Sequence, residues 1–216
     1  MKVRVKKTAA SLAPFGLAMA LLLAGCAATA SGPAPIAPAL RAAARAGNPR
    51  AQFRLGVLLM RRGHSRRRLA AGVAWIRRAA RGNLAVAQDR LGRLYLAGEG
   101  VQQNTTLALR WIGEAARRGA PAAQLQLGDF YAAGAYVPLN RARAYYWYSV
   151  AAKPGQGAMD IYNIAQVRAF ARRRRAAIGV SLSPARRARI ARRVAAWRAR
   201  PSVPYRGFIP LPSLSP

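Results

Sequence analysis

Residues 87–116 read AQDRLGRLYLAGEGVQQNTTLALRWIGEAA, and residues 123–152 read AQLQLGDFYAAGAYVPLNRARAYYWYSVAA, 36 positions further along the chain. A less regular copy lies 36 positions earlier, over residues 51–80. All three copies share four sets of columns, which in the first copy are Ala51-Gln52, Leu55-Gly56, Trp75 and Ala79-Ala80. Self-similarity at one fixed period of this size indicates an array of repeated supersecondary units.

Each copy has the hydrophobic spacing of two helices. In the second copy, small and apolar residues recur every three or four positions and predict a first helix over residues 84–97, which Gly98 ends. The same reasoning predicts a second helix over residues 105–118. Gly92 and Ala108 are small enough to let the two helices approach closely, and the repeated tryptophan fills the space between layers. We therefore expect helical hairpins whose core positions recur along the chain.

The shared pattern A-Q-x-x-L-G-x-x-Y-x-x-G-x-x-V-x-x-N-x-x-x-A-x-x-W-x-x-x-A-A resembles the Sel-one-like repeat, a longer relative of the tetratricopeptide unit. The first copy departs from it, with Leu59, Arg62 and Ser65 in place of Tyr, Gly and Val, as is common in a terminal unit that caps a stack. The resemblance implies an all-α fold, a right-handed α-solenoid of about three 36-residue antiparallel helix pairs over residues 40–157. It also implies an adaptor that mediates contacts between proteins.

Arg-rich helical sequence follows the third copy over residues 158–200. Ser183-Pro184 suits a helix start, and Ile190 and Trp197 lie on the apolar stripe of that helix. We expect these helices to cap the solenoid, and the alternative is a basic amphipathic helix that lies on a membrane. Residues 201–216 hold five prolines and predict an extended tail, either without a binding role or as a peptide ligand for a partner or for the protein's own groove.

The first 25 residues have the pattern of a bacterial lipoprotein signal peptide. Basic residues precede an apolar run over residues 12–24, which is shorter than the roughly 20 residues of a membrane-spanning helix. The run ends in Leu23-Ala24-Gly25-Cys26, which resembles a lipobox and implies lipid attachment to Cys26, the only cysteine of the chain. A plain secretory signal with an incidental cysteine is the alternative.

The position of the protein in the cell envelope follows from the same resemblance. Ala27 stands where an Asp commonly marks inner-membrane retention, so the resemblance implies a lipid-anchored protein of the outer membrane that faces the periplasm. Residues 26–39 are rich in Ala and Pro and predict a tether between the lipid and the solenoid.

The charge of the chain is far from balanced. There are 37 Lys+Arg and 5 Asp+Glu, and removal of the four bases of the leader lowers the formal charge from +32 to +28. Residues 161–216 hold no acidic residue, and their longest basic run is Arg172, Arg173, Arg174 and Arg175. Arginine pairs with phosphate and carboxylate, so this run predicts an anionic envelope partner: acidic exopolysaccharide, lipopolysaccharide, peptidoglycan or lipid. An Arg-rich composition imposed by the genome or by an acidic medium explains the charge equally well, and nucleic acid is not expected to meet an exported protein.

The residues that carry catalysis or bind metals are scarce. One His, one Cys and five carboxylates in different repeat columns form no catalytic set, no phosphate loop and no metal-ligand spacing. We therefore expect a protein that is not an enzyme and needs no cofactor and no metal.

The remaining candidate site is the concave face, which the first helices of such solenoids line. Its predicted partner-binding residues are Arg54, Arg90, Arg93, Gln126 and Asp129. The sequence thus predicts a periplasm-facing lipoprotein whose repeats scaffold an unidentified envelope protein. The alternative is a binder of anionic envelope polymer or lipid that assists polysaccharide secretion.

Overall fold

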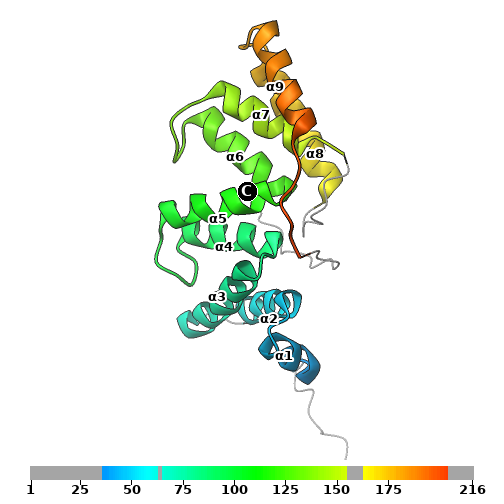
Figure 1. The fold of residues 1–216 in the computed structure, drawn as a ribbon. Coiled ribbons are helices and arrows are strands. Elements are labelled where there is room, and N and C mark those ends of the chain that lie inside the picture. The colour runs from blue at the N-terminus through cyan, green and yellow to red at the C-terminus, as the bar shows by residue number, and fades with distance from the viewer. Residues whose placement is uncertain (1–35, 63–64, 155–162, 204–216) are drawn as a thin grey trace, which may run out of the picture. The chain divides into compact units, whose positions relative to one another are not determined.

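A computed structural model describes residues 36–62, 65–154 and 163–203. Across these residues the chain forms nine α-helices and no strand (Figure 1). They are α1 (Pro38–Arg45), α2 (Pro49–Arg61), α3 (Arg66–Arg81), α4 (Ala85–Ala97), α5 (Thr105–Arg117), α6 (Pro121–Ala133), α7 (Arg141–Ala151), α8 (Ile164–Gly179) and α9 (Pro184–Ala196). The predicted leader, Cys26 and most of the tether lie outside the described residues, as do residues 204–216 of the tail. Within the described ranges, no helix is both long and apolar enough to cross a bilayer.

The three sequence copies form three helix pairs, as predicted. The most extensive contacts join α2 to α3, α4 to α5 and α6 to α7, and the pairs meet through α3 with α4 and α5 with α6. This succession of hairpins confirms an α-solenoid. The first helix, α1, packs against α2 and begins at Pro38, two residues before the predicted start of the repeat region.

The repeated glycines sit where the two helices of each pair cross. A Cβ atom on Gly92 would lie 2.5 Å from Cγ1 of Ile112 and 3.0 Å from the carbonyl oxygen of Ala108. Gly56 meets Gly72 and Ile76 in the same way one period earlier. These distances are shorter than van der Waals contact, so only glycine fits, and the predicted close approach at Gly92 and Ala108 is confirmed.

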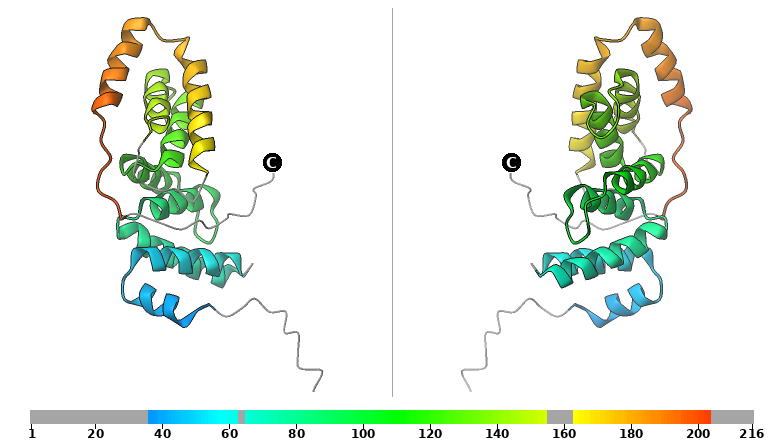
Figure 2. Two further views of the ribbon diagram at one scale, coloured as in Figure 1. Left: turned by 90° about the vertical axis from the view of Figure 1, so that its right-hand side faces the viewer. Right: turned by 90° about the vertical axis from the view of Figure 1, so that its left-hand side faces the viewer.

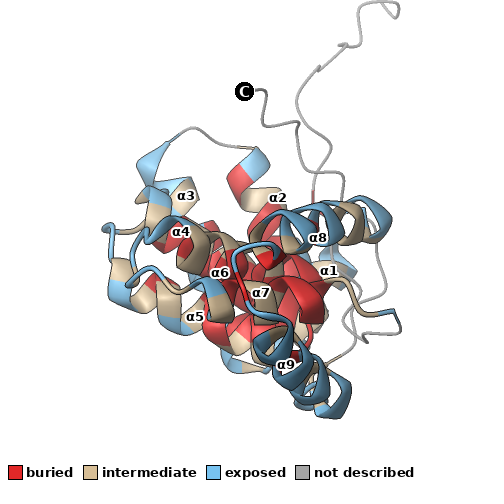
Figure 3. Cartoon of the chain, turned by 90° about the horizontal axis from the view of Figure 1, so that it is seen from above, coloured by how far each residue is buried: buried red, intermediate tan, exposed pale blue. Residues whose placement is uncertain are grey.

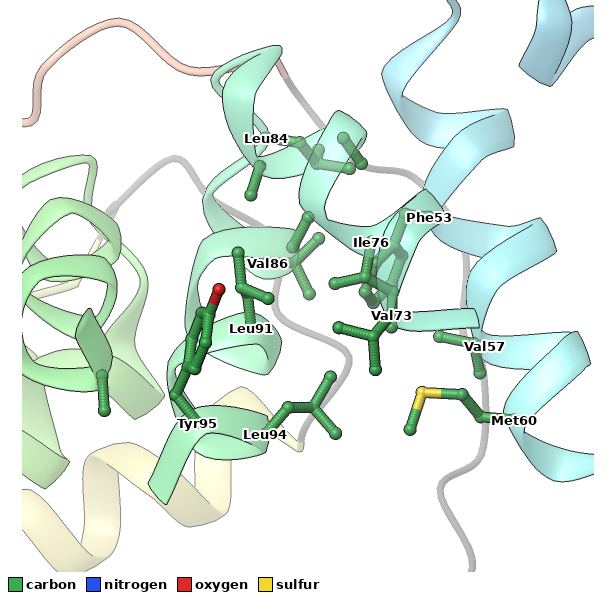
Figure 4. Close-up of a cluster of buried hydrophobic side chains, with 14 residues drawn as sticks. Phe53, Val57, Met60, Val73, Ile76, Leu84, Val86, Leu91, Leu94 and Tyr95 are labelled. Atoms are coloured by element: carbon green, nitrogen blue, oxygen red, sulfur yellow. The ribbon is translucent and has the colours of Figure 1, made fainter. Parts of the chain in front are cut away.

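The three repeated tryptophans pack in register. Trp75, Trp111 and Trp147 are each partly buried against a different core cluster, and each cluster is built mainly from residues that precede its tryptophan in the chain. Figure 4 shows the cluster that receives Trp111, which includes Phe53, Ile76 and Leu91 from α2, α3 and α4. The tryptophans therefore recur as core positions between successive layers, as predicted.

Helix ends are set by a second group of repeated residues. The side chains of Asn104 and Asn140 accept the backbone N–H groups three residues further on, at 2.8 and 2.9 Å, and so start α5 and α7. Gly98 ends α4 with a φ of +69°, as expected. In the first pair, Arg68 occupies the asparagine column and Ser65 is the N-cap instead. As a result α3 begins about one turn earlier than its counterparts, a departure that the repeat pattern does not predict.

A buried glutamine joins each unit to the helix before it. The Nε2 groups of Gln52, Gln88 and Gln124 donate to the carbonyl oxygens of Ala44, Ala80 and Ala116, at 3.2, 3.0 and 3.0 Å. Each of these carbonyls lies in the last turn of a helix, where no intrahelical donor is available. Because α1 supplies the first carbonyl, it acts as the second helix of an incomplete preceding unit.

The last two helices cover the end of the solenoid. Helix α8 packs against α6 and α7, and α9 packs against α7, consistent with the predicted capping role. Figure 3 shows that most of α8 and α9 is exposed, whereas the repeat helices carry the buried residues. The Nζ atom of Lys153 lies 3.3 to 3.4 Å from three carbonyl oxygens at the C-terminal end of α9 and so anchors that helix to the last repeat unit.

Candidate functional site

The segment after α9, residues 197–203, runs back along the solenoid (Figure 2). We call it the return segment. The backbone N–H of Arg200 donates to the carbonyl of Arg117 at 2.9 Å, and the guanidinium of Arg118 donates to the carbonyl of Pro201. The hydroxyl of Ser202 donates to the carbonyl of Asn83 at 3.0 Å. An extended peptide is thus held through backbone groups and through the side chains of Arg118 and Ser202.

The surface under the return segment consists of the turns that join one repeat unit to the next. Arg117 is the last residue of α5, and Asn83, with a φ of +61°, lies in the turn between α3 and α4. Ala85 opens α4, and its N–H donates to the hydroxyl of Ser202 at 3.2 Å. The first N–H groups and last carbonyls of a helix lack intrahelical partners, so a repeat array presents them at every joint. These joints form a ladder of hydrogen-bonding groups suited to an extended chain.

Glu114 forms the charged centre of this contact. Its carboxylate lies 2.6 Å from Arg117, 4.0 Å from Arg118 and 3.8 Å from Arg200 of the return segment. The hydrogen bond from Arg117 lowers the pKa of Glu114, and desolvation partly opposes it. The carboxylate therefore stays ionised at neutral pH and attracts the return segment.

Two of the predicted partner-binding arginines form ion pairs within the chain. Arg90 lies 3.6 Å from Glu99, and the Nε of Arg93 donates to the fully buried carboxylate of Asp89 at 3.0 Å. Arg54, on α2, is exposed. A partner at this face would contact Arg54 directly and would compete with existing pairs at the other two.

The other two predicted residues lie on α6, which α8 packs against. Asp129 accepts a hydrogen bond of 2.8 Å from the hydroxyl of Tyr148 and lies 3.2 Å from Arg174. Burial raises the pKa of Asp129, and the pKa of Tyr148 is raised by burial and by the adjacent carboxylate. Gln126 is half-buried, and no described residue hydrogen-bonds to its Oε1. Asp129 thus joins α6 to α8, and its predicted role in partner binding stays a prediction.

The predicted anion-binding run does not form one cluster. Consecutive helical residues point about 100° apart, so the four arginines face different surroundings. Arg172 and Arg173 are exposed, Arg174 pairs with Asp129, and Arg175 lines a pocket beside α7 and α9.

Catalytic or metal-binding geometry is not seen in the described ranges. No group of three His, Cys, Asp or Glu residues there is placed to hold a metal ion. A cavity of about 680 Å³ opens between α3 and the loop before α5, and its charged lining residues are Arg66 and Glu99. One such pair is not a catalytic set.

Sequence reasoning missed the joint surface under the return segment. The prolines of the tail predict an extended chain over residues 201–216 that can act as a ligand for the protein's own groove, whereas the described part of it, residues 201–203, lies on the joints between repeat units. Asn83, Ala85 and Arg117 carry no sequence signal for this contact, because they take part through backbone atoms.

Comparison with known proteins settles the family. The family model of the Sel1 repeat matches residues 49–84, 85–119 and 121–155. A Sel1 repeat protein from Oxalobacter formigenes is 31% identical, with a TM-score of 0.50, and the match covers 58% of this chain and 95% of that one. The chain belongs to the Sel1 repeat family. The matched repeats coincide with the pairs α2–α3, α4–α5 and α6–α7, and Sel1 repeats generally mediate protein–protein interaction.

A second solved structure shares the fold. It is a protective antigen of uropathogenic Escherichia coli strains with an SLR fold, 24% identical, with a TM-score of 0.56. The match covers 78% of this chain, which spans 37% of the length of that protein. No curated protein was found to match the chain. Helices α1, α8 and α9 and the return segment lie outside the matched repeats.

Proposed function

We propose that this Sel1 repeat protein is a non-enzymatic scaffold that binds extended segments of an envelope protein at the joints between its repeat units. The observation that carries the proposal is the return segment, which occupies two joints as an extended peptide. Its hydrogen bonds with Asn83, Ala85 and Arg117 use backbone groups of the solenoid, so they do not depend on which side chains form the joint. A partner segment that offers the same backbone groups, a hydroxyl side chain opposite Asn83 and Ala85, and a basic residue opposite Glu114 fits the same surface.

The membrane location is part of the proposal. The lipobox-like sequence before Cys26 supports a lipid anchor, and the absence of Asp after it supports the outer membrane, with the repeats facing the periplasm. We expect labelled palmitate to be incorporated into the full chain and not into a Cys26→Ala variant. A Cys26→Ala chain that stays with the membrane fraction after its leader is cleaved would contradict the lipid anchor.

Site-specific photocrosslinking in intact cells tests the joint surface. Arg81, which ends α3 two residues before Asn83, and Arg110, on α5, are both exposed helical arginines. A photoreactive residue at position 81 should capture a defined protein, and the same residue at position 110 should not. Equal capture from the two positions, or none from either, would overturn the proposal.

A variant that weakens the contact of the return segment makes the same crosslinking experiment more specific. Ser202→Ala deletes the hydroxyl's hydrogen bonds to Asn83 and Ala85, each worth about 1 kcal/mol. Of the hydrogen bonds between described residues of the return segment and Asn83, only the one from the N–H of Val203 then remains, so the joint should open more often and the capture from position 81 should rise several-fold. Ser181→Ala, in the turn between α8 and α9, is the matched control and should leave the capture unchanged.

A second function is favoured by the charge of α8 and α9. Residues 164–196 hold ten arginines and no acidic residue, and seven of these arginines are exposed. This surface supports binding of an anionic envelope polymer or lipid, with about 1 kcal/mol for each base near an anionic surface. Such binding should weaken steeply with salt, whereas capture of a protein segment at the joints should depend on it less.

A further inference from the structure

Four arginines line one pocket between α7 and α9. The pocket has a volume of about 290 Å³. From α9 it is lined by Arg186, Arg189 and Arg193, and from the first turns of α7 by Arg143. The other described lining residues are Asn140, Tyr146, Ala142 and Ile190, and none of the described lining residues is a carboxylate.

The spacing of these residues explains why they converge. Positions 186, 189 and 193 are three and four residues apart, so their side chains emerge on one face of α9. Helix α9 packs against α7, and Ile190 is the buried residue of α9 at this contact. The packing thus directs the arginine face of α9 toward the N-terminal turns of α7.

Aromatic rings, in place of carboxylates, support two of the four arginines. The guanidinium carbon of Arg193 lies 5.2 Å from the ring centre of Tyr146. Arg143 lies 5.3 Å from the ring centre of Tyr131 and donates to its hydroxyl at 3.3 Å. These contacts hold the two guanidinium groups in place without neutralising their positive charge.

Among the described residues, no carboxylate forms an ion pair with the arginines of the pocket. The ion pairs among the described residues involve six other arginines: Arg90, Arg93, Arg117, Arg118, Arg174 and Arg200. The N-terminus of α7, at Asn140, adds the positive end of a helix dipole to the same pocket. Four like charges that converge in one cavity repel each other unless an anion compensates them.

From this arrangement we propose that the α7–α9 pocket binds the phosphate group of a small ligand or of a lipid headgroup. Arginine forks pair with the oxygens of an oxyanion, and four forks offer more donors than one carboxylate can accept. A phosphate presents more oxygens in a tetrahedral arrangement and therefore matches donors that arrive from two helices. The volume leaves room for part of the group that carries the phosphate. This proposal deepens the second proposed function, because three of the pocket arginines belong to the α8–α9 surface, and it does not rest on the scaffold function, because none of the joint residues lines the pocket.

The test uses the full chain and two probes. Inorganic phosphate is titrated at low ionic strength by calorimetry, and vesicles of phosphatidylcholine with one fifth phosphatidic acid are titrated by co-sedimentation. The pocket variant is Arg186→Gln with Arg189→Gln. The matched control is Arg172→Gln with Arg192→Gln, which removes the same charge from exposed positions on α8 and α9 outside the pocket.

We expect the pocket variant to weaken phosphate binding at least tenfold and the control to change it less than twofold. Loss with vesicles alone, specific to the pocket variant, would identify a lipid headgroup as the source of the phosphate. Loss with inorganic phosphate and unchanged vesicle binding would identify a soluble phosphate ligand, and loss with both probes would show that the pocket accepts the phosphate group from either source. Equal loss in both variants, or no binding of either probe by the native chain, would overturn the proposal. Circular dichroism of each variant confirms that the helices remain folded.

Discussion

The pair α4–α5 and the pair α8–α9 are consecutive helices of similar length, but α4 packs along α5, whereas α8 and α9 pack on the last repeat pair and not on each other. Helix α4 buries nine residues and α5 buries five, whereas α8 buries Ala171 and Gly179 and α9 buries Ile190. The repeat pair is fixed by close packing along its full length. The terminal pair is fixed by contacts at a few points, among them Asp129 with Arg174 and Lys153 with the end of α9. The comparison indicates that the repeat pairs supply the stability of the fold, whereas α8 and α9 present most of their charged side chains to solvent.

The largest expected effect lies in the repeat pair. Gly92→Ala places a methyl group against Ile112 and should destabilise the protein by about 3 kcal/mol, measured by urea unfolding. Gly113 is the matched control, because the atoms nearest to a Cβ there belong to the flexible guanidinium of Arg117 and lie at 3.5 Å or more. Gly113→Ala should be neutral or stabilise by up to about 1 kcal/mol. Similar losses at both positions would show that close packing does not distinguish the repeat pair.

The next effect concerns the glutamine that joins two units. Gln88→Met keeps the volume but removes the side-chain donor to the buried carbonyl of Ala80, which still accepts from the N–H of Asn83, and should cost about 1.5 kcal/mol. Gln102→Met, at an exposed loop position, should cost less than about 0.5 kcal/mol. If the two variants unfold at the same urea concentration, the glutamine contributes nothing to the joint.

A smaller and local effect is expected in the terminal pair. Lys153→Met removes the donor to the last carbonyls of α9 and should cost about 1 kcal/mol, confined to that helix. Hydrogen exchange should therefore speed up in α9 and stay unchanged in α4 and α5. Uniformly faster exchange would mean that α9 and the repeats unfold as one unit.

The smallest expected effect is on the pH dependence of stability, which has opposite signs at Glu114 in the repeat region and at Asp129 in the contact with α8. The pKa of Glu114 is lowered below its ordinary value of 4.5, so its contribution to stability is complete above that pH and is lost as the pH falls through the lowered value. The pKa of Asp129, in the contact with α8, is raised above 3.8, so its contribution has the opposite sign: it is complete below that pH and lost as the pH rises. A Glu114→Gln variant should therefore lose less stability on acidification from pH 6 to pH 3 than the native chain, measured as the change in Tm. A steeper acid loss in the variant would contradict the assigned sign.

The repeat pairs were predictable from the sequence because each residue that determines their packing recurs at a fixed position of the 36-residue repeat. Gly92, Ala108 and Trp111 recur at one period, and the structure places each where the column required. The early start of α3 was not predictable from the repeat pattern, because Arg68 removed the asparagine cap and Ser65 replaced it from a different column.

The binding surfaces were less predictable for physical reasons. Arg172 and Arg173 are neighbours in the sequence, but helical geometry spreads such a run around the axis. Arg143 and Arg189 are far apart in the sequence, and only the contact between α7 and α9 brings them to one pocket. Arginines that are adjacent in the sequence are therefore a poor guide to which arginines lie together in space. The joint surface was hidden because backbone atoms at Asn83 and Arg117 form it.

The contacts of the return segment also depend on the number of repeat units in the solenoid. Each buried glutamine hydrogen-bonds only to the helix directly before its own. One more 36-residue unit would therefore add one more hydrogen bond of this kind and leave the others unchanged. The return segment, in contrast, starts at α9 and reaches back as far as Asn83. A duplicated unit would carry α9 beyond that reach. Growth of the array by duplication would thus free the first joint, and with it the surface that a partner would occupy.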